Sequence, residues 1–587
     1  MFKLVSTIKG SMIAGVILAF VLFGNTLRHD FVLDDGLVIV NNNIIKHGYT
    51  GVFEAFQHSH TFGATGIEDS GYRPIPIAIF SILWALTGGT PFGFHLLNVF
   101  LFGLTLGIML QVLFRGFRDQ LNQTQILLIT MLFAVHPLHS EVVANVKELE
   151  DILQLLFVLT SWWFLIRFVE VQNYRMLVFS SVFLALAMLS KETSLMFIIV
   201  APIYLFLFSS ATKRKALIAA GSLMATAVVF WGVRYVAVDM NQQIQLTVLN
   251  NALASLPSRW WQIVSALWMQ VEYLTLFFYP SVLSFDYSFN QIPLINVWGM
   301  RAIAALILGL LSVGITVYLL VEKRVSGFGL AFYLLMMVPV SNIIVLIGST
   351  MAERFAYMPS LGMSVAVVAL LWESKFFQKR KKLAQTLLIV ASLLLGTRTL
   401  IRNKDWKSDE VLFAADVVNS PMSTRTHMTL GTTLLQKSSR ALDQQQALAL
   451  VTQARKHLVT SVEILPENYE SHYNIGVIDQ QFGRDDLALK SFERCLEIAP
   501  EYALALNNAG VIHFNRKEYE KAEECFLSAY KINQLNGDIL ANRALVEYRK
   551  GNYAEAIPYA EQALKVNPMH QGAKNMLAGA RQALAPM

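Results

Sequence analysis

Acidic and basic side chains gather at a small number of places in a sequence that is otherwise strongly apolar. Asp34 and Asp35 stand side by side, while Arg73, Lys191 and Arg354 lie at the ends of apolar runs. A carboxylate can remove a proton from an attacking hydroxyl group, and fixed cations can neutralise a departing phosphate. Charged groups are costly next to hydrocarbon, so their placement is itself a functional hypothesis. The pattern indicates transfer of a group from a lipid phosphate.

A second polar segment joins histidines to charged residues. It begins His136-Pro137-Leu138-His139-Ser140-Glu141 and continues through Lys147 to Asp151. Two histidines three residues apart offer weak evidence for a divalent cation, which would neutralise phosphate as a lysine does. The metal candidates are Asp35, His136, His139 and Glu141. The same histidines could instead form hydrogen bonds with carbonyl groups of loops.

Each charged residue also has a purely structural interpretation. Asp34 and Asp35 could cap a helix next to the membrane. The basic residues at the ends of apolar runs could extend their charged groups to the membrane surface, as long basic side chains do. Glu353 could form an ion pair with its neighbour Arg354.

The apolar runs that position these residues follow from the composition. The 587 residues are 55% hydrophobic and 15% charged, with a mean hydropathy of +0.47, whereas soluble domains carry about 25% charged residues. A purely soluble protein is therefore excluded. A bilayer requires about 20 mostly apolar residues for each span. Such runs predict about eleven spans, near 11–28, 92–114, 124–138, 152–168, 174–190, 193–210, 216–237, 297–321, 328–347, 358–373 and 384–401.

Basic residues predict the orientation of these spans, because lysine and arginine favour the cytoplasmic side. They occur at every second short connection, for example at Arg115 and Arg118 and at 213–215. This alternation places the N-terminus in the cytoplasm. It places the polar segments and the C-terminal part on the extracytoplasmic side. The stretch 260–279 breaks the alternation if it spans, so we expect it to be re-entrant or to lie along the membrane.

The C-terminal part repeats with a period of 34 residues. Small residues at fixed positions allow two helices of one unit to touch, and a proline ends the second helix. The pattern predicts three helix pairs, and a fourth if that unit carries an insertion of 11 residues. The matching positions are Pro466, Pro500 and Pro568; Gly476, Gly510 and Ala544; Ala488, Ala522 and Ala556; Phe492 and Phe526.

The predicted domains are a membrane domain over 1–402, a linker over 403–422, about four repeats over 423–570 and a capping helix over 571–587. From Ser423 onward, 18 basic residues balance 18 acidic ones, so the net charge of +6 belongs to the membrane domain. Cys495 and Cys525 lack the spacing of a metal site or a disulfide framework, and we expect them to be buried fillers. We expect no nucleic-acid partner.

The ordered motifs resemble the transmembrane and tetratricopeptide repeat-containing (TMTC-like) O-mannosyltransferase family, within the GT-C class of glycosyltransferases. Each motif alone is weak, but the ordered set followed by repeats is specific. The matching strings are Phe31-Val32-Leu33-Asp34-Asp35, Tyr72-Arg73-Pro74, Phe94-His95-Leu96-Leu97-Asn98, 136–141, Ser190-Lys191-Glu192, Asp286-Tyr287-Ser288 with Ile292-Pro293-Leu294, Pro339-Val340-Ser341-Asn342, Ala352-Glu353-Arg354 through Tyr357-Met358-Pro359-Ser360, and Arg402-Asn403-Lys404-Asp405-Trp406.

The resemblance implies an all-α, GT-C-type membrane domain followed by an α-solenoid of repeats. It implies inverting transfer of mannose or another hexose from a polyprenyl-phosphate donor to Ser/Thr hydroxyls of an acceptor protein. Asp34 would be the catalytic base with Asp35 assisting, and the phosphate would depart against Arg73, Lys147, Lys191 or Arg354. The supporting polar residues would be Tyr72, His95, His136, His139, Glu141, Asp151, Glu192, Asp286 and Glu353.

Two other functions fit the same sequence. One is a non-catalytic membrane scaffold that presents the concave face of the repeats to a protein or peptide. The other is an enzyme that transfers whole lipid-linked oligosaccharides. The short repeat array and the single sequon, Asn122-Gln123-Thr124, on the predicted cytoplasmic side favour the bacterial inner membrane over the endoplasmic reticulum.

Overall fold

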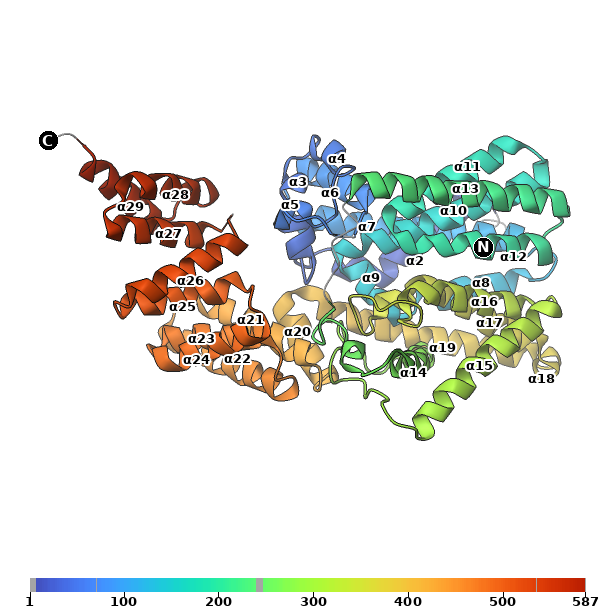
Figure 1. Ribbon diagram of the computed structural model, residues 1–587. Helices are drawn as coiled ribbons and strands as arrows, with labels where there is room; N and C mark the ends of the chain where they lie inside the picture. Colours follow the sequence, from blue (N-terminus) through green and yellow to red (C-terminus); the bar gives the residue numbers. More distant parts are fainter. Residues whose placement is uncertain (1–6, 70, 239–245, 535, 586–587) are drawn as a thin grey trace. The chain divides into compact units, whose positions relative to one another are not determined.

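The chain folds into helices joined by turns and loops (Figure 1), the longer of which include the connection from α14 (Arg259–Phe278) to α15 (Met300–Val321). The computed structural model describes residues 7–69, 71–238, 246–534 and 536–585, and no strand occurs among them. The helices form two compact units, Met1–Pro421 and Met422–Met587. We call the first the membrane unit and the second the repeat unit.

The membrane unit is built from helices of very different length. Its longer α-helices are α2 (Ile8–Phe23), α6 (Pro74–Thr87), α7 (Pro91–Gly116), α8 (Gln123–Ala134), α10 (Leu149–Val171), α11 (Tyr174–Ser190), α12 (Phe197–Leu207), α13 (Lys213–Ala237), α14 (Arg259–Phe278), α15 (Met300–Val321), α16 (Val325–Met337), α17 (Tyr357–Glu373), α19 (Lys381–Arg402) and α20 (Asp409–Asn419). Its short α-helices are α3 (Asn43–Lys46), α4 (Gly51–Glu54), α5 (Phe62–Thr65), α9 (Ser140–Ala144) and α18 (Lys375–Gln378). Single turns that bear on the site are η2 (Gly36–Val40), η3 (Pro137–His139), η4 (Val146–Glu148), η5 (Glu192–Met196), η8 (Glu353–Ala356) and η9 (Asn403–Lys407).

Among the described residues, seven helices are long and apolar enough to cross a membrane, or eight if one bent pair forms a single span. Four apolar helices of 10–17 residues accompany them. The chain is therefore a multi-pass membrane protein, while the count of eleven spans and the orientation remain predictions. The candidate spans are Ile8–Thr26, Pro91–Gly116, Val146–Val171, Lys213–Ala237, Met300–Val321, Glu353–Glu373, Lys381–Lys407 and the bent pair Gln123–Ala134 with Pro137–Ala144.

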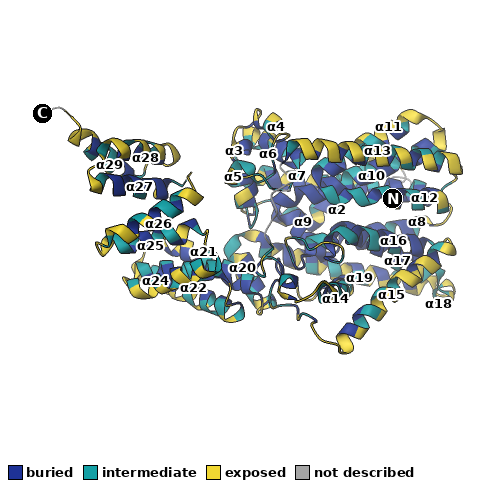
Figure 2. Cartoon of the chain, in the orientation of Figure 1, coloured by how far each residue is buried: buried dark blue, intermediate teal, exposed yellow. Residues whose placement is uncertain are grey.

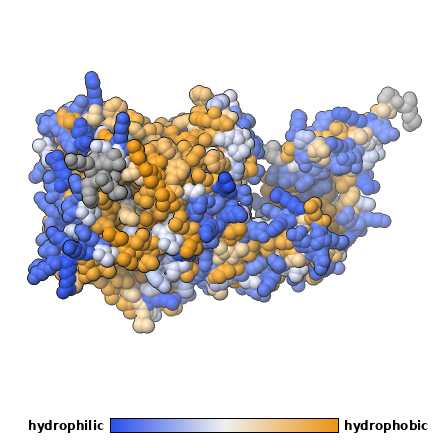
Figure 3. Space-filling model, turned by 180° about the vertical axis from the view of Figure 1, so that it is seen from behind, coloured by the Kyte–Doolittle hydropathy of each residue, from blue (hydrophilic) through white to orange (hydrophobic). Residues whose placement is uncertain are grey.

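Exposed apolar side chains mark the surface that faces lipid. On α15 the exposed fractions of Met300, Leu310 and Val321 are 89%, 75% and 74%, and exposed residues line much of this helix (Figure 2). Figure 3 shows hydrophobic residues over a broad band of one face of the membrane unit, with hydrophilic residues gathered beside it. A continuous apolar surface of this extent is stable in a bilayer and not in water.

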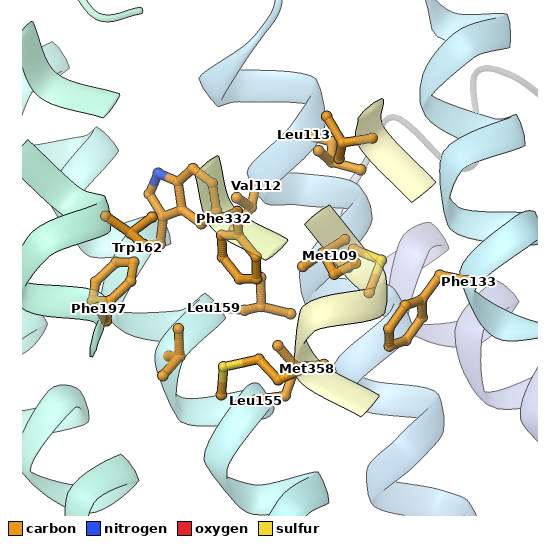
Figure 4. Close-up of a cluster of buried hydrophobic side chains, with 14 of the residues drawn as sticks. Met109, Val112, Leu113, Phe133, Leu155, Leu159, Trp162, Phe197, Phe332 and Met358 are labelled. Atoms are coloured by element: carbon orange, nitrogen blue, oxygen red, sulfur yellow. The ribbon is translucent and has the colours of Figure 1, made fainter. Parts of the chain in front are cut away.

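The core of the membrane unit is aromatic and closely packed (Figure 4). Trp162 of α10, 2% exposed, lies between Phe197 of α12 and Phe332 of α16, with ring centroids 6.0 and 6.3 Å away. Met109 of α7 and Leu159 of α10 are 0% and 1% exposed in the same cluster. This core positions α10 and α12, at or before whose N-terminal ends charged residues lie.

Glycine allows α2 and α7 to pack with their backbones in contact. A Cβ at Gly103 would lie 2.6 Å from Cα of Val16, and a Cβ at Gly107 would lie 2.8 Å from Cα of Met12. A Cβ at Gly15 would overlap the carbonyl oxygen of Gly103. Spacing small residues four apart is the arrangement that permits close helix packing in a membrane.

In its described residues, the repeat unit consists of four helix pairs and a final helix. In the second and third pairs the glycine of the first helix meets a phenylalanine of the second: a Cβ at Gly476 would lie 2.5 Å from Phe492, and one at Gly510 would lie 2.7 Å from Phe526. The sequence period of 34 therefore reflects one repeated helix contact. The pairs are α21 (Thr424–Ser438) with α22 (Gln444–Ile464), α23 (Tyr469–Gln481) with α24 (Asp485–Ile498), α25 (Ala503–Asn515) with α26 (Tyr519–Ile532) and α27 (Gly537–Lys550) with α28 (Tyr553–Val566), followed by α29 (Gln571–Ala583).

The segment 403–422, expected to be a linker, is largely helical. It comprises η9 and α20 and falls in the membrane unit up to Pro421. Of the two cysteines, Cys495 is buried and Cys525 is partly exposed, and both are free thiols.

We predict that Gly15→Leu lowers the thermal unfolding midpoint of the purified protein in detergent. The added side chain has no space between α2 and α7, and overpacking of this kind costs about 1–3 kcal/mol. The matched control is Gly221→Leu in α13, where a Cβ would meet nothing within 4 Å. Equal unfolding midpoints for the two variants would contradict the close contact of α2 with α7.

Candidate functional site

Among the described residues of the membrane unit, nine charged side chains from segments far apart in the sequence form one network, six of them buried and three partly buried. We call it the charged cluster. Five are carboxylates and four are cations, so the cluster is close to electrically neutral when all are ionised. Its members are Arg73, Lys147, Lys191, Arg354, Glu141, Glu148, Glu150, Asp151 and Glu192.

Glu150 is the centre of the charged cluster, because one of its oxygens meets three cations. Lys147 Nζ lies 3.0 Å and Lys191 Nζ 3.2 Å from Glu150 Oε1, and an Arg73 guanidinium nitrogen donates to the same oxygen. Lys191 Nζ also lies 2.6 Å from Asp151 Oδ2. Burial alone would lower the pKa of Lys191, but the surrounding carboxylates raise it.

The two arginines are held by paired contacts. Arg73 donates from Nη2 and Nε to the two oxygens of Glu192, at 3.1 and 3.2 Å. Burial alone would lower the pKa of Arg73, but Glu150 and Glu192 raise it well above its usual value. The backbone N–H of Arg354 donates to Glu141 Oε2 at 2.8 Å, and its guanidinium pairs with the other oxygen. These ion pairs, rather than extension toward water, determine where both side chains lie.

Local sequence explains why these side chains converge. Glu150 and Asp151 stand in the first turn of α10, where the helix dipole favours acidic groups. Arg73 precedes Pro74, which begins α6 and keeps the preceding residue out of the helix. The backbone of Lys191 is extended, with φ −159° and ψ 127°, so that α11 ends before it and η5 begins after it.

The two aspartates of the first loop have different environments. Asp35 is fully buried and accepts hydrogen bonds from the N–H of Val32 at 3.0 Å and of Lys147 at 2.6 Å. Burial raises the pKa of Asp35 to about 8, although both N–H groups favour its charged form. Asp34 is half-buried, and within the described chain its carboxylate has no hydrogen bond or ion pair. Its negative charge acts on Lys147 and Arg354. Asp35 therefore positions the loop, and Asp34 is available to a ligand.

The backbone beside Asp34 forms hydrogen bonds with residues near the C-terminal end of the membrane unit. Leu33 has a positive φ of 55°, a conformation that costs energy for a side chain of this kind. Its N–H donates to Asp409 Oδ1 of α20 at 2.7 Å, and the N–H of Asp30 donates to the carbonyl of Lys407 at 3.0 Å. These two bonds fix the segment that carries Asp34.

A cavity of about 510 Å³ opens beside the charged cluster. Its volume lies within the range of small-molecule sites, about 300–1,000 Å³. Its lining includes both polar and apolar residues, and Asp34 is not among them. The polar lining residues include His60, Arg73, Lys147, Glu150, Lys191, Glu192 and Arg354, and the apolar ones include Leu246, Pro339, Leu346, Ile347 and Phe355.

Several of the expected supporting residues have structural partners outside the cavity. The Tyr72 hydroxyl donates to the carbonyl of Phe56 at 2.9 Å, and His95 Nε2 lies 3.3 Å from the carbonyl oxygen of Asp30. His136 Nε2 lies 2.9 Å from the carbonyl oxygen of Phe277. His139 Nε2 lies 2.9 Å from Ser360 Oγ.

Asp286 and Glu353 belong to a second buried network. Glu353 accepts from the N–H of Ser284 and from the hydroxyl of Tyr287, at 2.6 and 2.8 Å, so it does not pair with its neighbour Arg354. Asp286 accepts from the N–H of Ser288 at 2.8 Å. In the same region Arg402 donates to both oxygens of Asp416, at 2.8 and 3.2 Å. This network joins α19 and α20 to the chain around 284–288.

In the described chain the predicted metal ligands do not form a group of three, although the ring centroids of His136 and His139 lie 6.0 Å apart. Both oxygens of Asp35 already accept backbone hydrogen bonds, as described above. The one group of three acidic or histidine ligands that lie within 4.8 Å of one another is Glu148, Glu150 and Asp151. Lys147 and Lys191 stand between these carboxylates. A metal ion at this place would have to displace an ammonium group.

Glu148, Glu150 and His60 were not identified as site residues from the sequence. The sequence Lys147-Glu148-Leu149-Glu150-Asp151 places four charges at the start of an apolar helix, which is the signal for the first two. His60 lies in a polar loop and has no comparable signal.

The sequence matches three descriptions of known protein families. Residues 74–233 match Dolichyl-phosphate-mannose-protein mannosyltransferase. Residues 241–313 match Protein O-mannosyl-transferase TMTC, DUF1736. Tetratricopeptide repeats match 469–502, 503–534 and 537–570.

Two curated relatives and one solved structure illustrate the similarity. Protein O-mannosyl-transferase TMTC4 of Mus musculus is 28% identical over 470 residues, covering 71% of this chain and 63% of its own length. Protein O-mannosyl-transferase TMTC3 of Homo sapiens is 24% identical, covering 96% of this chain and 68% of its own. The chain thus spans less than two thirds of the mouse relative. The crystal structure of YrrB, a TPR protein, is 17% identical with a TM-score of 0.22, covering 32% of this chain and 87% of its own.

We predict that Asp409→Ala speeds hydrogen exchange at the amides of Leu33 and Asp34. Loss of an acceptor for a partly buried N–H costs about 1–3 kcal/mol, and the first loop would open more often. Asp409→Asn keeps an acceptor oxygen and should largely preserve the protection. Lys404→Ala, an exposed position in η9, is the control. Unchanged exchange in Asp409→Ala would show that this bond does not hold the loop.

Proposed function

We propose that this chain, which is similar to protein O-mannosyl-transferases of the TMTC family, transfers mannose, or another hexose, from a polyprenyl-phosphate donor to a Ser/Thr hydroxyl of an acceptor protein. One observation carries the proposal. A cavity large enough for a sugar phosphate is lined by Arg73, Lys191 and Arg354, while the unpaired carboxylate of Asp34 lies near enough to act electrostatically on Arg354.

The proposed reaction is a single inverting displacement. Asp34 accepts the proton of the acceptor hydroxyl, whose oxygen attacks the anomeric carbon of the sugar. The bond between that carbon and the phosphate oxygen breaks, and the phosphate keeps the electron pair. Arg73, Lys147, Lys191 and Arg354 stabilise the charge that develops on the phosphate. Asp35 acts through the backbone of Val32 and Lys147, so we assign it a positioning role.

An apolar groove supports a lipid-linked donor. A space of about 360 Å³ lies between α14, α15 and α16 and is almost entirely apolar. Val338, Ser341 and Ile343 line this groove, and Pro339 and Val340 of the same segment line the cavity. A polyprenyl chain in the groove would therefore lie close to a phosphate in the cavity.

The acceptor and the compartment belong to the same proposal. We assign the concave face of the repeats to an acceptor protein or peptide, since stacked helix pairs form extended binding surfaces. The reaction would take place on the extracytoplasmic side, with the N-terminus in the cytoplasm. The bacterial inner membrane remains the compartment predicted from the sequence.

We predict that Asp34→Asn lowers the rate of mannose transfer from polyprenyl-phosphate mannose by about 10²–10⁴-fold, the usual contribution of a general base. The measurement is transfer to an acceptor protein by the purified full-length chain in detergent. Asp119→Asn, whose side chain is 77% exposed, is the matched control and should retain full activity. Full activity of Asp34→Asn would exclude the proposed base.

The same assay separates the two alternative functions. A non-catalytic scaffold would show no transfer with wild-type protein, and substitution of Asp34 or Arg73 would leave partner binding unchanged. An oligosaccharide transferase would add a glycan of several sugars, which the mass of the modified acceptor distinguishes from a single hexose.

A further inference from the structure

We infer that His60 recognises the sugar: its Nε2 accepts a hydrogen bond from a hydroxyl group of the hexose bound in the cavity. This inference rests on the proposed function and assigns a specificity-determining residue to that site. His60 stands in the loop before Arg73 and lines the 510 Å³ cavity.

One hydrogen bond of the ring and two of the backbone hold His60 in place. The carbonyl oxygen of Gly71 accepts from the backbone N–H of His60 at 3.0 Å and from ring Nδ1 at 2.8 Å. Asn42 Nδ2 donates to the carbonyl oxygen of His60 at 2.9 Å. A carbonyl oxygen only accepts hydrogen bonds, so Nδ1 carries the proton in this arrangement. In the neutral ring Nε2 then offers a lone pair, and no described residue hydrogen-bonds to it.

Gly71 makes this arrangement possible. A Cβ at Gly71 would overlap Cε1 and Nδ1 of the His60 ring, so the ring lies directly against the glycine backbone. Asp69 Oδ1 lies 3.6 Å from Nδ1 on the same side. The ring is thus held on its Nδ1 side by backbone and carboxylate oxygens.

The chemistry of the cavity favours a hydroxyl group, rather than a phosphate, as the ligand of His60. Arg73, Lys147, Lys191 and Arg354 are hydrogen-bond donors and suit phosphate oxygens. A phosphodiester has no hydrogen to donate, so a neutral imidazole nitrogen cannot serve it. A sugar hydroxyl can donate. Burial lowers the pKa of His60, and the positive charge of Arg73 lowers it further, which favours the neutral ring.

The test compares wild type with His60→Ala, His60→Gln and Gly71→Ala on polyprenyl-phosphate mannose and on its monodeoxy analogues. We expect His60→Ala to lower kcat/KM about 10- to 100-fold on the natural sugar, the effect of one hydroxyl contact. On the one analogue that lacks the contacted hydroxyl, wild type and His60→Ala should be equally slow. His60→Gln supplies an acceptor oxygen and should restore part of the rate. Gly71→Ala should displace the ring and resemble His60→Ala, with no further loss in the double variant.

Other outcomes overturn the inference. An unchanged rate in His60→Ala, or an equal loss on every analogue, would show that His60 does not read a sugar hydroxyl. Wild-type protein that transfers no sugar would instead refute the proposed function. In that case the inference about His60 is tested by measuring the binding of a short-chain prenyl mannosyl phosphate to wild type and to His60→Ala. An affinity at least tenfold lower in His60→Ala than in wild type supports the inference. Equal affinity of the two proteins, or no binding to wild type, refutes it. Unfolding midpoints of all variants report whether folding is preserved.

Discussion

The cost of burying charge is the constraint on which this structure depends. Each of the nine groups of the charged cluster would be strongly unfavourable alone in the membrane unit, and removing one partner of a buried ion pair typically costs about 3–5 kcal/mol. The charged side chains must therefore form ion pairs with one another, although they come from α10, η5, η8 and the segment before α6. Glu150, shared by Arg73, Lys147 and Lys191, is the point at which these segments are joined. The segments that carry the cluster, several of which line the cavity, cannot separate without exposing unpaired charge.

The arrangement separates structural from chemical roles among similar residues. Asp35 and Asp34 are neighbours, yet Asp35 accepts hydrogen bonds from two backbone N–H groups, whereas the carboxylate of Asp34 has no hydrogen bond or ion pair with the described residues. Glu141 and Glu353 are both buried acids, yet one holds Arg354 beside the cavity and the other holds a tyrosine in a different network. A residue type and its place at the end of an apolar run do not determine which role it takes. The partners supplied by the folded chain do.

This explains what could be predicted from the sequence. Local patterns sufficed for the all-α fold, the apolar helices and the repeats, because the 34-residue period arises from contacts such as Gly476 with Phe492 within one unit. One physical argument, the free-energy cost of placing charge near lipid, was enough to propose site residues such as Arg73, Lys191, Arg354 and Asp151. The sequence did not reveal that Glu148 and Glu150 pair with these cations, or that Asp286 lies elsewhere, because those facts depend on contacts between distant segments. For the same reason, the sequence did not reveal that η9 and α20, within the predicted linker 403–422, fall in the membrane unit.

The bond between Leu33 and Asp409 has a consequence for biosynthesis. Its partners are 376 residues apart, so the loop that carries Asp34 cannot take its final shape while the chain is still being inserted. Membrane segments are made in order from the N-terminus, and domains generally fold as they emerge. The proposed base would then be locked in place only after the last apolar helix has entered the membrane, which keeps an incomplete chain inactive. The order of synthesis would itself prevent sugar transfer by a chain that is not yet completely inserted.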